Sequence, residues 1–108
     1  MRAKEMLEEI KNLRNEIYAL ELEERDHGGE DIRNRLTLSR VTLEGMCATL
    51  KIKLERIKTP IFRDILDMRY VQGFTWRKTA DKLFFDQRWV VRLSKRAEKE
   101  LEEVWDNA

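Results

Sequence analysis

Helix-breaking residues are rare in this sequence and fall at only a few positions. The 108 residues include one Pro and four Gly, and 40% of them are charged. Leu, Glu, Lys and Arg, which dominate the stretches between these breakers, are good helix formers. Gly28-Gly29, Pro60 and Gly73 therefore divide the chain into helical segments. The sequence predicts an all-α fold without strands, in a chain that can bury one modest core.

The N-terminal part carries two apolar stripes that predict an antiparallel helical hairpin. A first helix of about 24 residues has its apolar residues at alternating spacings of four and three, as in a coiled-coil seam. A second stripe runs from Ile32 to about Lys58, interrupted by the polar Ser39 and Lys53. Gly28-Gly29 should reverse the chain, because Gly supplies the left-handed conformation in which helices end. The stripes contain Met6, Ile10, Leu13, Ile17 and Leu20, and then Leu36, Leu43, Met46, Leu50 and Ile57.

Opposite charges favour packing of these two helices against each other. Residues 1–31 hold five basic and ten acidic side chains, and residues 32–58 hold seven basic and two acidic ones. Exposed ion pairs contribute only about 0 to 1 kcal/mol each, so the charges would select the partner and the apolar stripe would supply the free energy. The alternative is that the charges only solvate the surface. The seams could close within one hairpin or between chains, with Ser39 and Lys53 specifying the pairing, and we expect a homodimer or higher oligomer.

The remaining residues predict three shorter helices, and we assign residues 1–58 and 59–108 to separate domains. Thr59-Pro60 should begin the first helix, since Thr is a good N-cap and Pro loses no hydrogen bond at the first helical position. That helix should end at a left-handed Gly73, with Phe74 folding back on Met68.

Residues 75–97 have the pattern of a helix-turn-helix. Thr75 and Asp86 should cap its two helices, with Phe84-Phe85 as the turn. The inward positions are predicted to be Ala80 and Leu83 in the first helix, and Val90, Leu93, Ala97, Leu101 and Val104 in the second.

Positive charge is concentrated in this window. Residues 75–97 hold seven basic and two acidic side chains, a local charge of +5 in a chain whose total is +1. The cations recur on one outward face at the start of the last helix, where a recognition helix meets bases and phosphates. Arg, Gln and an exposed Val have groups that can read base edges, whereas cations of the preceding helix suit phosphates. We predict base contacts from Gln87, Arg88, Val91, Arg92 and Lys95, and backbone contacts from Thr75, Arg77, Lys78 and Arg96.

Beyond Ala97 the charge reverses, with five acidic residues against Lys99 alone. Phosphate would repel this end of the helix, so we expect it to be freer to face a protein. The acidic residues are Glu98, Glu100, Glu102, Glu103 and Asp106.

These residues resemble the C-terminal helix-turn-helix of sigma-70-type factors (region 4), and still more the small phage regulators of the ArpU and RinA type. The resemblance covers residues 60–104 and rests on Arg69-Tyr70-Val71-Gln72-Gly73-Phe74-Thr75-Trp76, Thr79-Ala80-Asp81-Lys82-Leu83, Trp89-Val90-Val91-Arg92-Leu93 and Lys95-Arg96-Ala97. It implies a three-helix domain whose last helix enters the major groove near a promoter. It also implies regulation of late or packaging genes, with Gln87, Arg88, Val91 and Arg92 at base-reading positions and Thr75, Arg77 and Lys78 at the backbone.

Two aromatic residues depart from the pattern of these families. Phe84 stands where a Gly or another small residue is common, and a left-handed Phe would be strained. Trp89 replaces the common Thr or Ser and would lie at the groove edge or against Trp76. Packing in the core or turn is the favoured role for both Trp side chains.

Other functional classes lack support in the sequence. The chain has no nucleotide-binding loop, catalytic triad or zinc pattern, so we expect no enzyme, cofactor or metal. His27 should be an exposed turn residue, and Cys47 small buried filler rather than a nucleophile. A single Cys excludes an internal disulfide and, with no apolar run of membrane-spanning length and no signal peptide, indicates a cytoplasmic protein of the host bacterial cell.

The leading hypothesis is a sequence-specific regulator of phage transcription that binds double-stranded DNA. A DNA-recognition component of phage packaging would use the same helix. A third hypothesis is a helical interaction module, in which the hairpin and acidic end bind a protein such as RNA polymerase without DNA.

Overall fold

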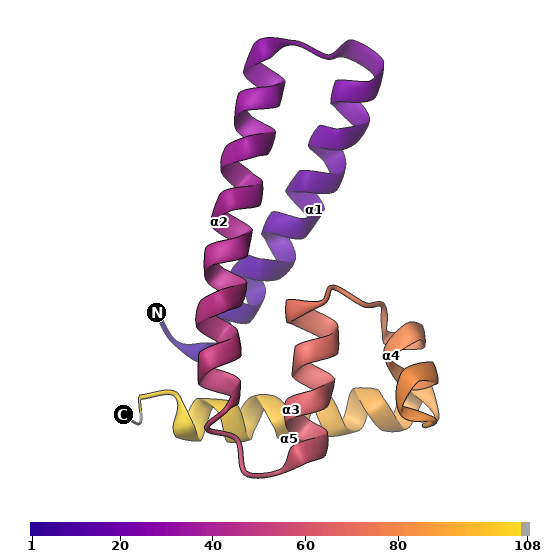
Figure 1. Cartoon of the computed structure of the whole chain (residues 1–108). Coiled ribbons are helices and arrows are strands. Elements are labelled where there is room, and N and C mark those ends of the chain that lie inside the picture. The colour runs from indigo at the N-terminus through magenta and orange to yellow at the C-terminus, as the bar shows by residue number, and fades with distance from the viewer. Residues whose placement is uncertain (107–108) are drawn as a thin grey trace.

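The computed structural model describes residues 1–106 and contains only helices and short connections in that range (Figure 1). The all-α prediction is confirmed. The elements are α1 (Ala3–His27), α2 (Glu30–Leu54), α3 (Pro60–Leu66), the π-helical turn η1 (Asp67–Val71), α4 (Trp76–Leu83) and α5 (Gln87–Val104). The hairpin of α1 and α2 stands on one end of α5, and α4 lies at the other end.

α1 and α2 pack along the predicted seam within one chain. Met6, Ile10, Ile17 and Leu20 are buried in α1, and Leu36 and Leu50 are buried in α2. Ion pairs connect the acidic helix to the basic one, Glu16 with Arg35 at 3.8 Å and Glu21 with Arg40 at 3.2 Å. The predicted hairpin is therefore confirmed, and its charges pair across the seam.

The reversal between α1 and α2 occurs at Gly28-Gly29, but for a different reason than predicted. Gly28 has φ −54° and Gly29 has φ −157°, so neither residue is left-handed. A Cβ on Gly28 would lie 2.6 Å from the Glu24 carbonyl oxygen, which is far inside van der Waals contact. Gly28 is thus required for space rather than for its φ angle.

α3 begins at Pro60, as predicted, and Thr59 occupies the N-cap position. The prediction that Thr59 caps the helix is wrong, because its side chain accepts no hydrogen bond from the first turn. Its hydroxyl instead donates to the Glu100 carboxylate of α5 at 2.9 Å. α2 ends at Leu54, four residues before the predicted Lys58, and Ile57 is buried in the connection.

The C-terminal end of the α3–η1 helix is closed by Gly73. Its φ of +75° confirms the predicted left-handed stop. The Phe74 amide donates to the Met68 carbonyl at 2.8 Å, so Phe74 folds back through its backbone. Its ring lies 4.2 Å from the Lys78 ammonium, a cation-π contact that places Phe74 beside α4.

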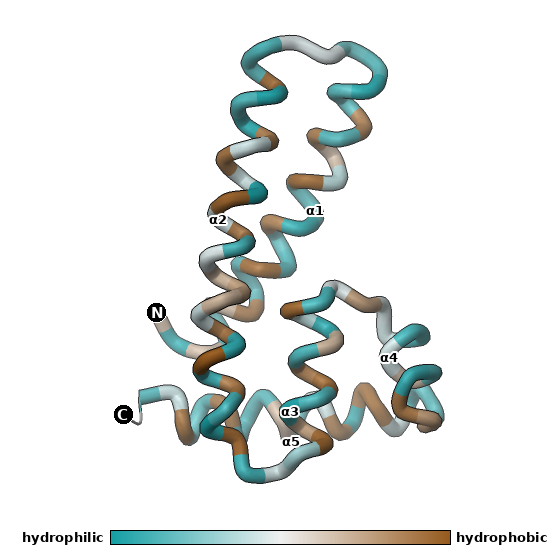
Figure 2. Tube along the Cα trace, viewed as in Figure 1, coloured by the Kyte–Doolittle hydropathy of each residue, from teal (hydrophilic) through white to brown (hydrophobic). Residues whose placement is uncertain are grey.

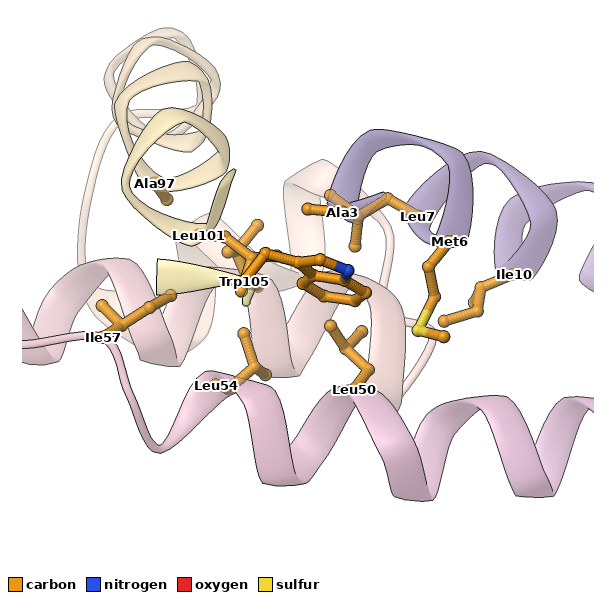
Figure 3. Packing of buried hydrophobic residues seen from close by; sticks show 11 residues of the cluster. Ala3, Met6, Leu7, Ile10, Leu50, Leu54, Ile57, Ala97, Leu101 and Trp105 are labelled. Carbon is orange, nitrogen blue, oxygen red and sulfur yellow. The ribbon is translucent and has the colours of Figure 1, made fainter. Parts of the chain in front are cut away.

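The largest core cluster joins residues from α1, α2 and α5, so both predicted domains contribute to it. Trp105, just after α5, packs between Leu50 and Leu54 of α2 and Leu101 of α5 (Figure 3). Its indole N–H donates to the Met1 carbonyl at 2.7 Å. Lys53 lies 4.6 Å from the Trp105 ring and donates to its carbonyl at 2.8 Å. The apolar stripe of α2 is therefore interrupted at Lys53 because this side chain binds Trp105 at the C-terminal end of α5.

Candidate nucleic-acid interface

α3, α4 and α5 form a three-helix unit with a small core of its own. Ile65 of α3, Ala80 of α4, and Val90 and Leu93 of α5 are buried together. α4 and the first half of α5 are consecutive, mutually packed helices joined by a short turn, which is the arrangement of a helix-turn-helix.

Both helices of this motif begin at the predicted caps. The Thr75 hydroxyl oxygen accepts from the Lys78 amide at 3.0 Å, and the Asp86 carboxylate accepts from the Arg88 amide at 3.4 Å. The Thr75 carbonyl also accepts from the Thr79 hydroxyl at 2.8 Å. Thr75, predicted to contact the DNA backbone, thus already uses its side chain to begin α4.

The turn places Phe84 in the left-handed conformation, with φ 59° and ψ 38°. Its ring is 93% exposed, so no packing within residues 1–106 offsets the backbone strain. Phe85 and Trp89 are also exposed, at 39% and 42%. Trp89 therefore lies at the surface, contrary to the predicted packing role. Trp76 does pack against the small core, and the Arg69 guanidinium lies 4.4 Å from its ring.

Four of the five predicted base-reading residues lie together. Gln87, Arg88, Val91 and Arg92 line one shallow depression with Asp86 at the start of α5. Gln87, Arg88 and Arg92 are exposed and Val91 is half-buried. Within residues 1–106 neither Arg88 nor Arg92 forms an ion pair, so both guanidinium groups are free to meet an anion. The dipole of α5 favours an anion at the same place, and the Asp86 carboxylate, which accepts from the Arg88 amide, offsets part of this positive potential.

Lys95, the fifth predicted reader, is separated from this group. It lines a different depression, between α1 and the second half of α5, with Arg2, Lys4, Glu5 and Glu8. Acidic and basic side chains line this depression in equal number, so Lys95 does not extend a purely cationic surface. The reading surface that the structure brings together therefore ends at Arg92.

The predicted backbone-contacting cations lie on two helices. Arg77 and Lys78 are exposed in the first turn of α4, where the helix dipole favours anions, and Arg96 is exposed on α5. The cation-π contact with Phe74 orients the Lys78 ammonium.

The acidic end of α5 is occupied by contacts within the chain. Glu98 accepts from the Tyr70 hydroxyl at 3.2 Å, Glu100 accepts from Thr59, and both Glu102 and Asp106 pair with Arg2. Burial of the phenol, reinforced by the negative charge of Glu98, raises the pKa of Tyr70 to about 12. The expectation that this end faces a protein stays a prediction, because the Asp106 side chain is still 74% exposed although these four carboxylates have partners within the chain. They hold α5 to the rest of the molecule.

Arg14, which no sequence pattern identified, connects the hairpin to the three-helix unit. Its Nη2 donates to the carbonyls of Tyr70 and Val71, both at 2.7 Å, at the end of η1. The same nitrogen lies 3.6 Å from the Cys47 sulfur. Burial raises the pKa of the half-buried Cys47 thiol, and the nearby guanidinium opposes this effect. The only signal in the sequence was a charged residue directly beside the apolar seam position Leu13.

Comparisons with protein-family models, curated proteins and solved structures find no match for this chain. None of the helices in residues 1–106 is long and apolar enough to span a bilayer. In the same residues no three His, Cys, Asp or Glu side chains group where they could hold a metal ion.

Proposed function

We propose that this protein binds double-stranded DNA in a sequence-specific manner and regulates transcription. The start of α5 would enter the major groove, with Gln87, Arg88, Val91 and Arg92 at base edges. Arg77, Lys78 and Arg96 would contact the phosphates on either side. The phage late-gene setting of this activity comes from the sequence resemblance alone.

One observation carries the proposal. Arg88 and Arg92 are exposed one turn apart at the capped start of α5, and the described residues provide no carboxylate partner for either. Exposed cations are common, but these two share a depression with an amide side chain and an apolar side chain. Bidentate Arg, Gln and an apolar group are the set that distinguishes base pairs in the major groove.

The test is selection of bound sites from random duplexes, followed by affinity measurements over a range of salt concentrations. The Arg88→Ala/Arg92→Ala double variant should bind the selected duplex at least tenfold more weakly at low salt, because each base-contacting Arg contributes about 1–3 kcal/mol. Its slope of log affinity against log salt should change little, whereas Arg77→Ala/Lys78→Ala, which removes two phosphate contacts, should decrease that slope by about 2.

Arg25→Ala/Arg33→Ala is the matched control, since it removes the same charge from exposed positions near the turn of the hairpin. It should leave the affinity for the selected duplex nearly unchanged. Equal losses in the two double variants would mean that binding reflects net charge alone, and the proposed recognition surface would be wrong.

A second candidate function is binding of a protein such as RNA polymerase without DNA. The exposed rings of Phe84, Phe85 and Trp89 favour it, because large aromatic side chains are enriched at protein interfaces. The acidic end of α5 supports it less than expected, since four of its five carboxylates have partners within the chain. Polymerase capture together with salt-insensitive, negligible duplex binding would select this function.

A further inference from the structure

The face of α2 opposite the hairpin seam carries a second apolar stripe. Residues 38, 41, 45, 48 and 52 recur at spacings of three and four and are all exposed. Leu38, Val41 and Ile52 are 68%, 61% and 61% exposed, which is high for large aliphatic side chains. α1 covers one side of α2, and no helix of residues 1–106 lies on the opposite side (Figure 1). Figure 2 shows hydrophobic segments recurring along α2, to which both the buried seam and the exposed stripe contribute.

The residues in the middle of this stripe are small, and the side-chain hydroxyls beside them already have hydrogen-bond partners. Gly45 and Ala48 occupy the central positions, and a Cβ built on Gly45 would have no neighbour within 4 Å. Thr42 and Thr49 lie along one flank, and their hydroxyls donate to carbonyls of α2 itself at 2.9 and 3.1 Å. Another helix can therefore approach the α2 backbone closely without burying an unpaired polar group.

The other flank holds one acidic and one basic side chain. Glu44 and Lys51 are exposed two turns apart, and neither has an ion-pair partner among residues 1–106. A flank with one charge of each sign is complementary to itself when two copies of the helix run in opposite directions.

We propose that this face binds a second copy of the chain, with the two α2 helices antiparallel about a twofold axis. In the register of an antiparallel coiled coil, Val41 packs against the partner's Ile52 and Gly45 against the partner's Ala48. The same register places Glu44 beside the partner's Lys51. The symmetry repeats each of these contacts, and the closest approach of the two backbones falls at the small residues.

The charges distinguish this arrangement from its alternatives. In a parallel pair the two copies of this flank would lie on opposite sides of the interface, so Glu44 would face the partner's Thr49 and gain no ion pair. A helix from a different protein would need its own complementary charges, whereas the second copy supplies them from residues already present. This self-association does not depend on DNA binding, because α2 lies outside the α4–α5 surface.

The test is sedimentation equilibrium of the whole chain, with the charges exchanged one at a time and then together. The protein should dimerise at micromolar concentration. Glu44→Lys and Lys51→Glu should each weaken dimerisation about tenfold, because each turns two attractive pairs into two repulsive ones. The Glu44→Lys/Lys51→Glu double variant should recover the original dimerisation constant, since the pairs are restored in reverse order.

Two further variants complete the design. Val41→Lys should sediment as a monomer at every concentration, and its far-UV circular dichroism should show unchanged helix content, because residue 41 is exposed in the single chain. Glu23→Lys makes the same charge change as Glu44→Lys at an exposed position on α1 and should leave dimerisation unchanged. A monomer at every concentration, or a double variant as weak as the single ones, would overturn the proposal.

Discussion

Replacing Gly73 with Ala should destabilise the protein mainly by displacing Arg14, although the two residues lie in different predicted domains. Gly73 has φ +75°, and a Cβ there would lie 2.6 Å from Arg14 Nη1 and 2.8 Å from its Cζ. Arg14 cannot yield freely, because its Nη2 donates to the Tyr70 and Val71 carbonyls. The substitution therefore combines backbone strain with the loss of a charged link between α1 and η1.

The magnitude follows from these two parts. A non-Gly residue in the left-handed region costs about 1–2 kcal/mol. Disrupting hydrogen bonds from a charged donor costs about 1.5–3 kcal/mol each in buried sites, and water can partly replace them at this half-buried position. We expect Gly73→Ala to lower the free energy of unfolding by about 3 kcal/mol. For a chain of this size that corresponds to a melting temperature lower by roughly 12–24 °C.

A double-mutant cycle with Arg14→Ala separates the two parts. In the Arg14→Ala background the added methyl group meets no guanidinium, so Gly73→Ala should cost only the backbone strain, about 1 kcal/mol. The entropy that Ala removes from the unfolded chain is the same in both backgrounds and cancels in the cycle. Urea unfolding of the four proteins gives the coupling, which should be about 2 kcal/mol. Equal costs in both backgrounds, within about 0.5 kcal/mol, would refute the role assigned to Arg14.

Three other substitutions test local features of the same region. Phe84→Gly should raise the free energy of unfolding by about 0.5–1 kcal/mol in urea titrations, because it relieves a left-handed residue whose ring is 93% exposed; a decrease would reveal a packing role for the ring. Asp86→Ala should lower the free energy of unfolding by about 1 kcal/mol through loss of the α5 cap, and no change would mean that the 3.4 Å contact is not a stabilising cap. The raised pKa of Tyr70, about 12 against a usual 10, stabilises the fold below pH 10, and this contribution is lost as the pH rises towards about 12. The stability difference between the original protein and Tyr70→Phe should therefore shrink over that pH range, and parallel curves would contradict this.

The features that the sequence predicted depend on neighbours within a few residues. Apolar spacing predicted the buried positions of α1 and α5, because a helix returns to the same face every three or four residues. Capping and the left-handed stop are equally local, and Thr75, Asp86 and Gly73 were confirmed in these roles. The cluster of Gln87, Arg88 and Arg92 follows from the same periodicity, since these residues are placed by one helix alone.

The features that the sequence did not predict require the tertiary structure. Thr59 has the side chain of an N-cap, yet its hydroxyl is taken by Glu100, which is 41 residues away. The negative charge at the end of α5 predicted a surface without contacts inside the chain. Only the fold brings Arg2 and Tyr70 to these carboxylates. Lys95 continued the cationic stripe, but the fold places it in a different depression, where acidic and basic side chains are equal in number. Charge patterns thus gave the sign of each surface, and chain packing decided which surfaces stay free.

The contacts that fix the hairpin to α5 turn the proposed self-association into a constraint on DNA recognition. Arg14 holds η1 to α1, and both Lys53 and Arg56 donate to the Trp105 carbonyl at the end of α5. An antiparallel α2 pair would therefore hold two α5 helices in one fixed relation, so sites selected by the dimer should be inverted repeats with a single spacing. Inserting about five base pairs rotates one half-site by half a turn and should reduce the affinity to that of one half-site. Equal affinity at both spacings would mean that each chain binds DNA separately.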